Sequence, residues 1–162
     1  MHKQLAVPLV VGLVVVALAV AGIVYMQRGA HIELKGSILK VRTVAMEDTS
    51  ALAVLDFRFA NPADYPFVVR TVEVFMEDAQ GNRHNSVTVS EVDAKRLFEY
   101  FPRLGQKHNV SLLMRDSIKP HSTEDRMIAA RFDMPESKLE SRKRFIVRVE
   151  EVDGVQSEMA EK

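Results

Sequence analysis

The N-terminal part of the chain contains an uninterrupted apolar run from Leu5 to Met26, in which no residue carries a charge. At about 1.5 Å of rise per residue, a helix over this run would be roughly 33 Å long. The hydrocarbon core of a bilayer is about 30 Å thick, so the run predicts a transmembrane helix. The rest of the chain mixes polar and apolar residues, as a water-exposed domain does. We therefore expect a single-pass protein, with the lipid bilayer as one partner.

A cleaved secretory signal peptide is the alternative interpretation of this run. His2 and Lys3 form a short basic start, and residues 17–19 and 19–21 both have the small-x-small pattern of a cleavage site. The apolar run continues past these alanines and exceeds the usual signal core of about 7–15 residues. This length favours an uncleaved signal anchor, and removal of residues 1–21 stays the alternative.

The basic residues near the run bear on the orientation of the large domain. Four of them follow the run, and Lys3 alone precedes it: Arg28, Lys35, Lys40 and Arg42. A count of lysine and arginine would leave the domain in the cytoplasm, but long domains are translocated largely regardless of charge. The short head is typical of a signal anchor. We expect an extracytoplasmic domain on a bacterial cytoplasmic membrane.

The composition excludes several classes of protein. There is no cysteine, and the 22 basic residues balance the 22 acidic ones. The chain therefore has no disulfide framework, thiolate metal site or cysteine nucleophile. It also lacks a basic stripe with interleaved aromatic residues, so we expect no nucleic-acid partner. The residues after the apolar run suffice for one domain.

Alternation of apolar and polar residues predicts strands in that domain. From Ala51 to Phe59 the odd positions are apolar, while Asp56 and Arg58 fall on the other face. Further strands are expected over 32–41, 67–76, 86–90, 109–115, 128–133 and 145–150. The first of these changes its apolar parity near Gly36, which indicates a bulge or bend. About seven strands with short, turn-rich connections favour a β-sandwich.

Two short helices interrupt the strands. Ser90 and Asp93 are spaced as in a capping box, and apolar residues follow at helical spacing before Pro102. The segment 135–144, with Pro135 at its first position, predicts a second short helix. After Gly154 the chain is polar, and we expect residues 154–162 to form a flexible tail.

A resemblance to a known family follows from the turns. A strand that ends in Asn61-Pro62, a turn at Tyr65-Pro66 and a valine-rich strand resemble the late-embryogenesis-abundant type 2, or WHy, domains. The resemblance implies an immunoglobulin-like β-sandwich behind a single membrane anchor. The predicted organisation is a head at 1–4, a transmembrane helix at 5–26, a linker at 27–31, the immunoglobulin-like sandwich at 32–153 and the tail at 154–162.

The titratable residues show no catalytic or metal-binding pattern. The histidines are not spaced as helical metal ligands, and the adjacent carboxylate pairs do not follow a calcium-loop pattern. No phosphate loop or nucleophile elbow is present. We therefore expect no catalytic residues, no metal, no cofactor and no enzymatic activity, with a metal-dependent enzyme as the weaker alternative.

Two sets of residues are candidates for interaction with other proteins. Gly12, Ala19 and Gly22 lie near one face of the N-terminal helix, where small residues allow close helix packing. The expected helix after Ser90 carries Lys95, Arg96, Phe98 and Phe101, which form either a docking face or a face packed on the sandwich.

These features favour one function and leave an alternative. The favoured hypothesis is a non-catalytic accessory or interaction subunit of a larger membrane complex, such as an envelope, transport or electron-transfer assembly. Its helix would lie against helices of other membrane-protein subunits. The alternative is an independent, membrane-tethered stress-protective or ligand-binding domain of the WHy type.

Overall fold

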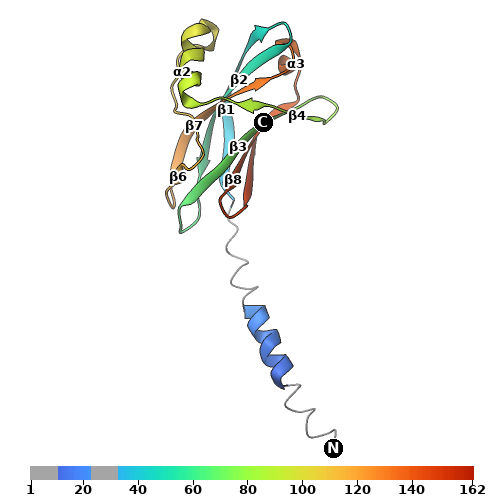
Figure 1. Ribbon diagram of the computed structural model, residues 1–162, viewed down its shortest axis with the longest axis vertical. Helices are drawn as coiled ribbons and strands as arrows, with labels where there is room; N and C mark the ends of the chain where they lie inside the picture. Colours follow the sequence, from blue (N-terminus) through green and yellow to red (C-terminus); the bar gives the residue numbers. More distant parts are fainter. Residues whose placement is uncertain (1–10, 23–32) are drawn as a thin grey trace, which may run out of the picture. The chain divides into compact units, whose positions relative to one another are not determined.

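The structure is a computed structural model, and it describes residues 11–22 and 33–162. The chain divides into two compact units, and the second begins at Glu33. The described part of the first unit is a helix over residues 11–22. The second unit is a β-sandwich with helical insertions (Figure 1).

The prediction of a transmembrane helix over residues 5–26 is wrong. The helix described at residues 11–22 rises about 18 Å, which is well short of the roughly 30 Å that a span requires. Among the described residues, no helix is both long and apolar enough to cross a bilayer. The signal-anchor and single-pass assignments are wrong for the same reason, because each requires a helix longer than the one that the structure describes. The predicted head at 1–4 and linker at 27–31 lie outside the described residues.

Two antiparallel sheets form the sandwich (Figure 1). The first has the order β1 (Lys35–Glu47), β2 (Ser50–Ala60), β7 (Thr123–Phe132) and β5 (Val87–Thr88). The second has the order β4 (Arg83–Asn85), β3 (Phe67–Glu77), β8 (Arg144–Glu151) and β9 (Gln156–Ala160), and β6 (Ser117–Ile118) also pairs with β3. The predicted β-sandwich is thus confirmed, with nine strands in the described residues. Its immunoglobulin-like assignment stays a prediction.

The main core lies between the two sheets, and β2 contributes to it as the alternation predicts. The odd-numbered residues of β2 are fully buried there, as are Phe132 of β7 and Phe145 and Val147 of β8. The rings of Phe132 and Phe145 lie 5.7 Å apart between their centroids. Burial of these apolar side chains from both sheets is what joins the two layers.

A second apolar layer covers the outer face of the first sheet. Leu52 and Val54 of β2 are also fully buried, on the face opposite the main core. They lie under α2 (Glu91–Tyr100) and the 3₁₀ turn η1 (Pro102–Leu104). Most of β2 is therefore buried on both faces, whereas its pattern indicates one polar face.

The ends of α2 follow the sequence signals. Ser90 Oγ accepts a hydrogen bond from the backbone N–H of Asp93 at 3.2 Å, as the capping spacing predicts. The helix ends at Tyr100, and Pro102 begins η1. The second predicted helix forms as the short α3 (Glu136–Glu140). Leu139, its buried residue, packs into the main core.

The C-terminal segment is a strand, so the prediction of a flexible tail at 154–162 is wrong. β9 pairs with β8, and its Ser157 and Met159 are buried on the core side. Arg142 donates two hydrogen bonds, of 2.8 and 2.6 Å, to the carboxylate of Glu161. Polar residues alternate with these two buried positions, which hides the strand from a search for apolar residues.

The parity change in β1 has a different position from the one predicted. The register with β2 shifts between Ile38 and Lys40, so Leu39 bulges into solvent and Val41 returns to the core side. Gly36 has another role, which is close packing. A Cβ there would overlap the carbonyl oxygen of Arg58 and lie 2.7 Å from Met159 Sδ.

Candidate functional site

A buried ion pair fixes the outer face of the first sheet beneath α2. The guanidinium of Arg42, on β1, contacts the carboxylate of Asp56, on β2, with an N–O distance of 2.5 Å. The two side chains are only 9 % and 8 % exposed. Arg42 also donates to the carbonyl oxygens of Leu104 at 2.7 Å and Gln106 at 2.9 Å. The pair therefore ties both strands to the chain that follows α2.

The same polar network continues to α2 itself. Asn109 donates to Asp56 at 2.9 Å, and its carbonyl oxygen accepts from Lys107 Nζ at 2.7 Å. Lys107 Nζ also donates to Glu91, in the first turn of α2, at 2.8 Å. Glu91 further accepts from the backbone N–H of Ser111 at 2.8 Å. Through these contacts the helix, its following loop and the sheet form one connected unit.

The carboxyl of Glu91 makes the stability that this network contributes depend on pH. Desolvation raises the pKa of its carboxyl, but the hydrogen bonds from Lys107 and Ser111 outweigh it and lower the pKa from 4.5 to about 2. Because the pKa is lower in the folded state, the stabilisation is complete above the unfolded pKa of 4.5. It is lost as the pH falls from 4.5 toward about 2.

We expect the melting temperature to fall across this acid range and the Glu91→Gln variant to show a smaller fall. Thermal unfolding followed by circular dichroism from neutral pH to about pH 2 measures both. Glu99→Gln removes an exposed carboxylate of the same helix and serves as the control. Its melting temperature should fall with acid as much as that of wild type. An identical fall in Glu91→Gln and wild type would show that this carboxylate does not contribute.

The structure divides the predicted docking residues into two pairs. Phe98 and Phe101 are half-buried and pack on the apolar layer of the first sheet. The guanidinium carbon of Arg42 lies 4.9 Å from the centroid of the Phe98 ring, so this ring also covers the ion pair. Lys95 and Arg96 are exposed. The aromatic and basic residues thus do not form one surface.

An apolar groove lies beside α2, and sequence analysis did not find it. Its volume is about 630 Å³. The residues that line it come from α2, β1, β2, the segment before α2 and β7: Met46, Leu52, Val89, Asp93, Arg96, Leu97, Glu99, Tyr100 and Arg131. Tyr100 is 78 % exposed. No sequence pattern could indicate this groove, because its lining residues are brought together only by the packing of α2 on the sheet.

The small residues of the N-terminal helix lie within the described residues 11–22. Gly12, Ala19 and Gly22 are exposed on that helix. A Cβ added at either glycine would meet no atom within 4 Å. Their proposed role in helix packing stays a prediction.

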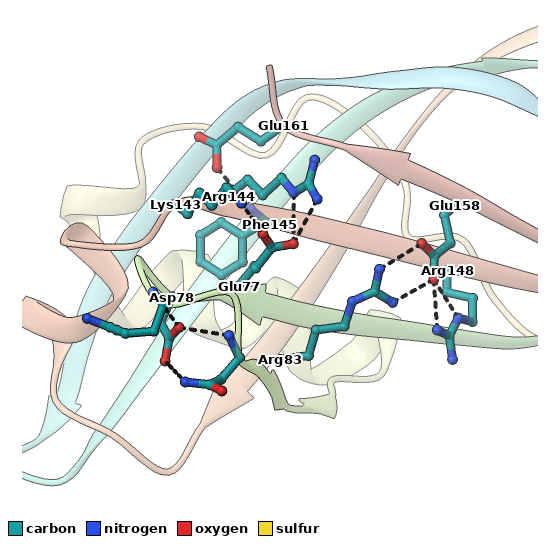
Figure 2. Close-up of polar contacts among 11 residues, drawn as sticks. Glu77, Asp78, Arg83, Lys143, Arg144, Phe145, Arg148, Glu158 and Glu161 are labelled. Atoms are coloured by element: carbon teal, nitrogen blue, oxygen red, sulfur yellow. Dashed lines mark hydrogen bonds and ion pairs between the residues drawn. The ribbon is translucent and has the colours of Figure 1, made fainter.

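The outer face of the second sheet carries a network of opposite charges (Figure 2). Glu158 accepts from Arg83 at 2.9 Å and from Arg148 at 2.7 Å. Glu77 accepts from Lys143 at 2.6 Å and from Arg144 at 2.8 Å. The hydrogen bond from Lys143, followed by that from Arg144, lowers the pKa of Glu77. These charges neutralise one another, so this face does not attract a ligand of one sign.

Two of the described histidines each lie beside a single carboxylate. His84 lies 3.0 Å from Asp78, and His121 lies 2.8 Å from Asp64, between the ring nitrogen and the carboxylate oxygen in each pair. In the parts of the chain that the structure describes, no three histidine, aspartate or glutamate side chains are placed to hold a metal ion.

Comparison with known proteins gives one structural likeness. No family model and no curated protein matches the chain. The chain is similar to an uncharacterized β-sandwich protein from Clostridium difficile, with 15 % sequence identity and a TM-score of 0.37. The match covers 80 % of this chain and 86 % of the crystallised one.

Proposed function

We propose that the sandwich domain is a non-catalytic interaction subunit that binds a protein partner at the groove beside α2. The observation that carries this proposal is the make-up of the groove. Its apolar lining residues are buried or half-buried and form the floor: Met46, Leu52, Val89 and Leu97. Its charged lining residues are exposed and form the rim: Asp93, Arg96, Glu99 and Arg131. An apolar centre inside a polar rim is the usual anatomy of a protein interface.

Tyr100 and Arg96 are the residues on which we expect binding to depend most. Tyrosine and arginine are enriched among the side chains that contribute most to binding energy. Tyr100 is highly exposed beside the apolar floor, and Arg96 forms an exposed ion pair with its neighbour Asp93 at 3.4 Å. Both side chains can therefore meet a partner without breaking contacts of the core.

The polar network beneath α2 also favours this function. Arg42 and Asp56 hold η1 and the loop after it against the sheet, and Glu91 holds the first turn of α2. A surface that is fixed before binding loses less conformational entropy when the complex forms. The network leaves the groove side of α2 available, because its hydrogen bonds are made on the opposite side, toward residues 104–111.

The partner that fits is a protein segment with an aliphatic or aromatic side chain between charges of both signs. The apolar residue would fill the floor of the groove. Its acidic neighbour would meet Arg96 or Arg131, and its basic neighbour would meet Asp93 or Glu99. Arg96 and Arg131 pair with Asp93 and Asp133 at 3.4 and 2.8 Å, but both pairs are exposed and contribute little, so a partner's charges can replace them.

Capture from cells with the full chain as bait tests the proposal. Wild type, a Tyr100→Ala/Arg96→Glu double variant and a Gln156→Ala control, which changes an exposed residue of β9, are compared by quantitative mass spectrometry. We expect one protein to be enriched by wild type and by the control, and depleted at least about tenfold with the double variant. Equal capture by all three baits, or capture of no protein, would contradict the proposal and favour an independently acting domain.

A further inference from the structure

A second recess opens where the chain passes twice between the two sheets. The first passage is at Ser86, because β4 pairs with β3 of the second sheet and β5 pairs with β7 of the first. The second is at residues 113–114. Leu112 N–H donates to Met127 on β7 at 2.9 Å, whereas Arg115 N–H donates to Val69 on β3 at 2.7 Å.

These two passages leave the middle of β3 without a paired strand on one edge, among the described residues. On that edge β6 pairs with residues 67–68 and β4 pairs with residues 75–77. Between them, no strand in the described part of the chain pairs with residues 70–74 on that side. On its other edge β3 pairs with β8 along almost its whole length. The second sheet thus has a gap of one short strand.

The register shows which backbone groups face this gap. Asp78 N–H donates to Asn82 toward β4, and successive residues of a strand point their backbone groups to opposite edges. Val72, Val74 and Met76 therefore point to the same edge as Asp78. Met76 is opposite His84 of β4, and the carbonyl of Val74 accepts from Ser86 Oγ at 2.7 Å. The N–H and C=O of Val72 are left facing the gap.

The recess at this gap is apolar and has a volume of about 690 Å³. Leu112 and Ile128, which belong to the main core, are among its lining residues. Val87 and Met114 also line it and are each 66 % exposed. Of the lining residues, Glu73 alone carries a charge. The gap therefore combines a free strand edge, an apolar recess and one carboxylate.

We propose that this gap binds a short extended peptide that adds a strand to β3. The pair of N–H and C=O groups on Val72 matches the backbone of one residue on an antiparallel strand, as in other cases of strand addition. The side chain of that residue would lie on the same side of the sheet as Val72, toward Leu112 and Ile128. This site shares Val89 with the lining of the groove beside α2, but its strand edge is on β3 and it does not depend on the function of that groove.

The geometry also specifies the composition and length of the peptide. In an antiparallel pair, the residue before the one opposite Val72 lies opposite Glu73. Glu73 lies 3.6 Å from Arg148, which is beyond hydrogen-bond distance, and its side chain is exposed, so its carboxylate can still favour lysine or arginine at that position and disfavour glutamate. Because β4 and β6 close the ends of the gap, the paired part spans about five residues, or roughly 16 Å.

A labelled pentapeptide tests this inference with the full chain. The probe has a central valine, a lysine before it and threonine at the other positions, and fluorescence anisotropy measures its binding. One matched peptide carries an N-methyl group on the central valine, which removes its backbone donor and keeps its side chain. A second has glutamate in place of the lysine.

We expect the first peptide to bind and the N-methylated one to bind about tenfold more weakly. The glutamate peptide should also bind more weakly, and Glu73→Gln should remove most of the difference between the lysine and glutamate peptides. Hydrogen exchange at the Val72 amide should slow on binding. No binding at millimolar peptide, equal binding of the N-methylated peptide, or binding without protection of Val72 would overturn the proposal.

Discussion

Replacing Asp56 by alanine is expected to destabilise the domain by about 3–5 kcal/mol, because it leaves a buried guanidinium without its counter-charge. The side chain of Arg42 is 9 % exposed, so water cannot replace the lost carboxylate. The substitution also removes the acceptor of Asn109, in the segment that follows η1. Urea unfolding followed by circular dichroism measures the loss.

The neighbouring position on the same face of β2 supplies the control. Arg58 forms an ion pair with Asp125 at 2.6 Å, but these side chains are 56 % and 39 % exposed. Exposed pairs of this kind contribute little, so Arg58→Ala should change the free energy of unfolding much less than Asp56→Ala. Similar losses in the two variants would mean that the ion pair of Asp56 is not buried in solution.

The second large effect is expected for Phe57→Ala, which should lower the free energy of unfolding by about 3–5 kcal/mol. Phe57 is fully buried between the sheets, and its ring centroid lies 5.8 Å from that of Phe59. Truncation removes apolar contacts and leaves a cavity that the rigid sheets fill only in part. The same urea experiment measures this loss.

Two further variants of the main core should lose less stability than Phe57→Ala. Phe57→Leu keeps most of the side-chain volume and should lose less stability than Phe57→Ala. Val147→Ala removes fewer atoms from the same core, so its loss should also be smaller. An unchanged urea midpoint for Phe57→Ala would show that the inward face of β2 is assigned incorrectly.

Sequence patterns correctly located the elements whose signals are local. The alternation in β2 predicts both its position and the residues that face the main core. The hydroxyl of Ser90 and the ring of Pro102 bracket α2 because each acts on the backbone beside it. Caps, proline and residue alternation are visible in a sequence because they involve neighbouring residues.

Other predictions were wrong because the sequence pattern of a segment does not show which strand it pairs with. Residues 109–115 alternate like a strand, yet they form only a single bridge, from Ser111 to Met127. The segment passes from one sheet to the other there, so it cannot stay paired with either. Residues 156–160 show little apolar character, yet they pair with β8 as β9 because β8 presents a free edge.

The candidate sites could be predicted even less. The groove beside α2 joins residues that are distant in the chain, and the gap along β3 exists only because two connections change sheets. Of the four residues predicted as a docking face, Arg96 lines the groove, whereas Phe98 covers Arg42. The aromatic and basic positions are close in sequence, but their directions on the helix differ.

For Asp56 and Arg58, the local pattern determines which face of β2 the side chains are on, and the tertiary structure determines whether they are exposed. Their alternation with apolar residues was sufficient to predict the strand and to place both side chains on its second face. Only the packing of α2 and the loop after it buried Asp56 and left Arg58 in solvent. A strand's periodicity comes from its own backbone, whereas the exposure of each face depends on which distant segment covers it.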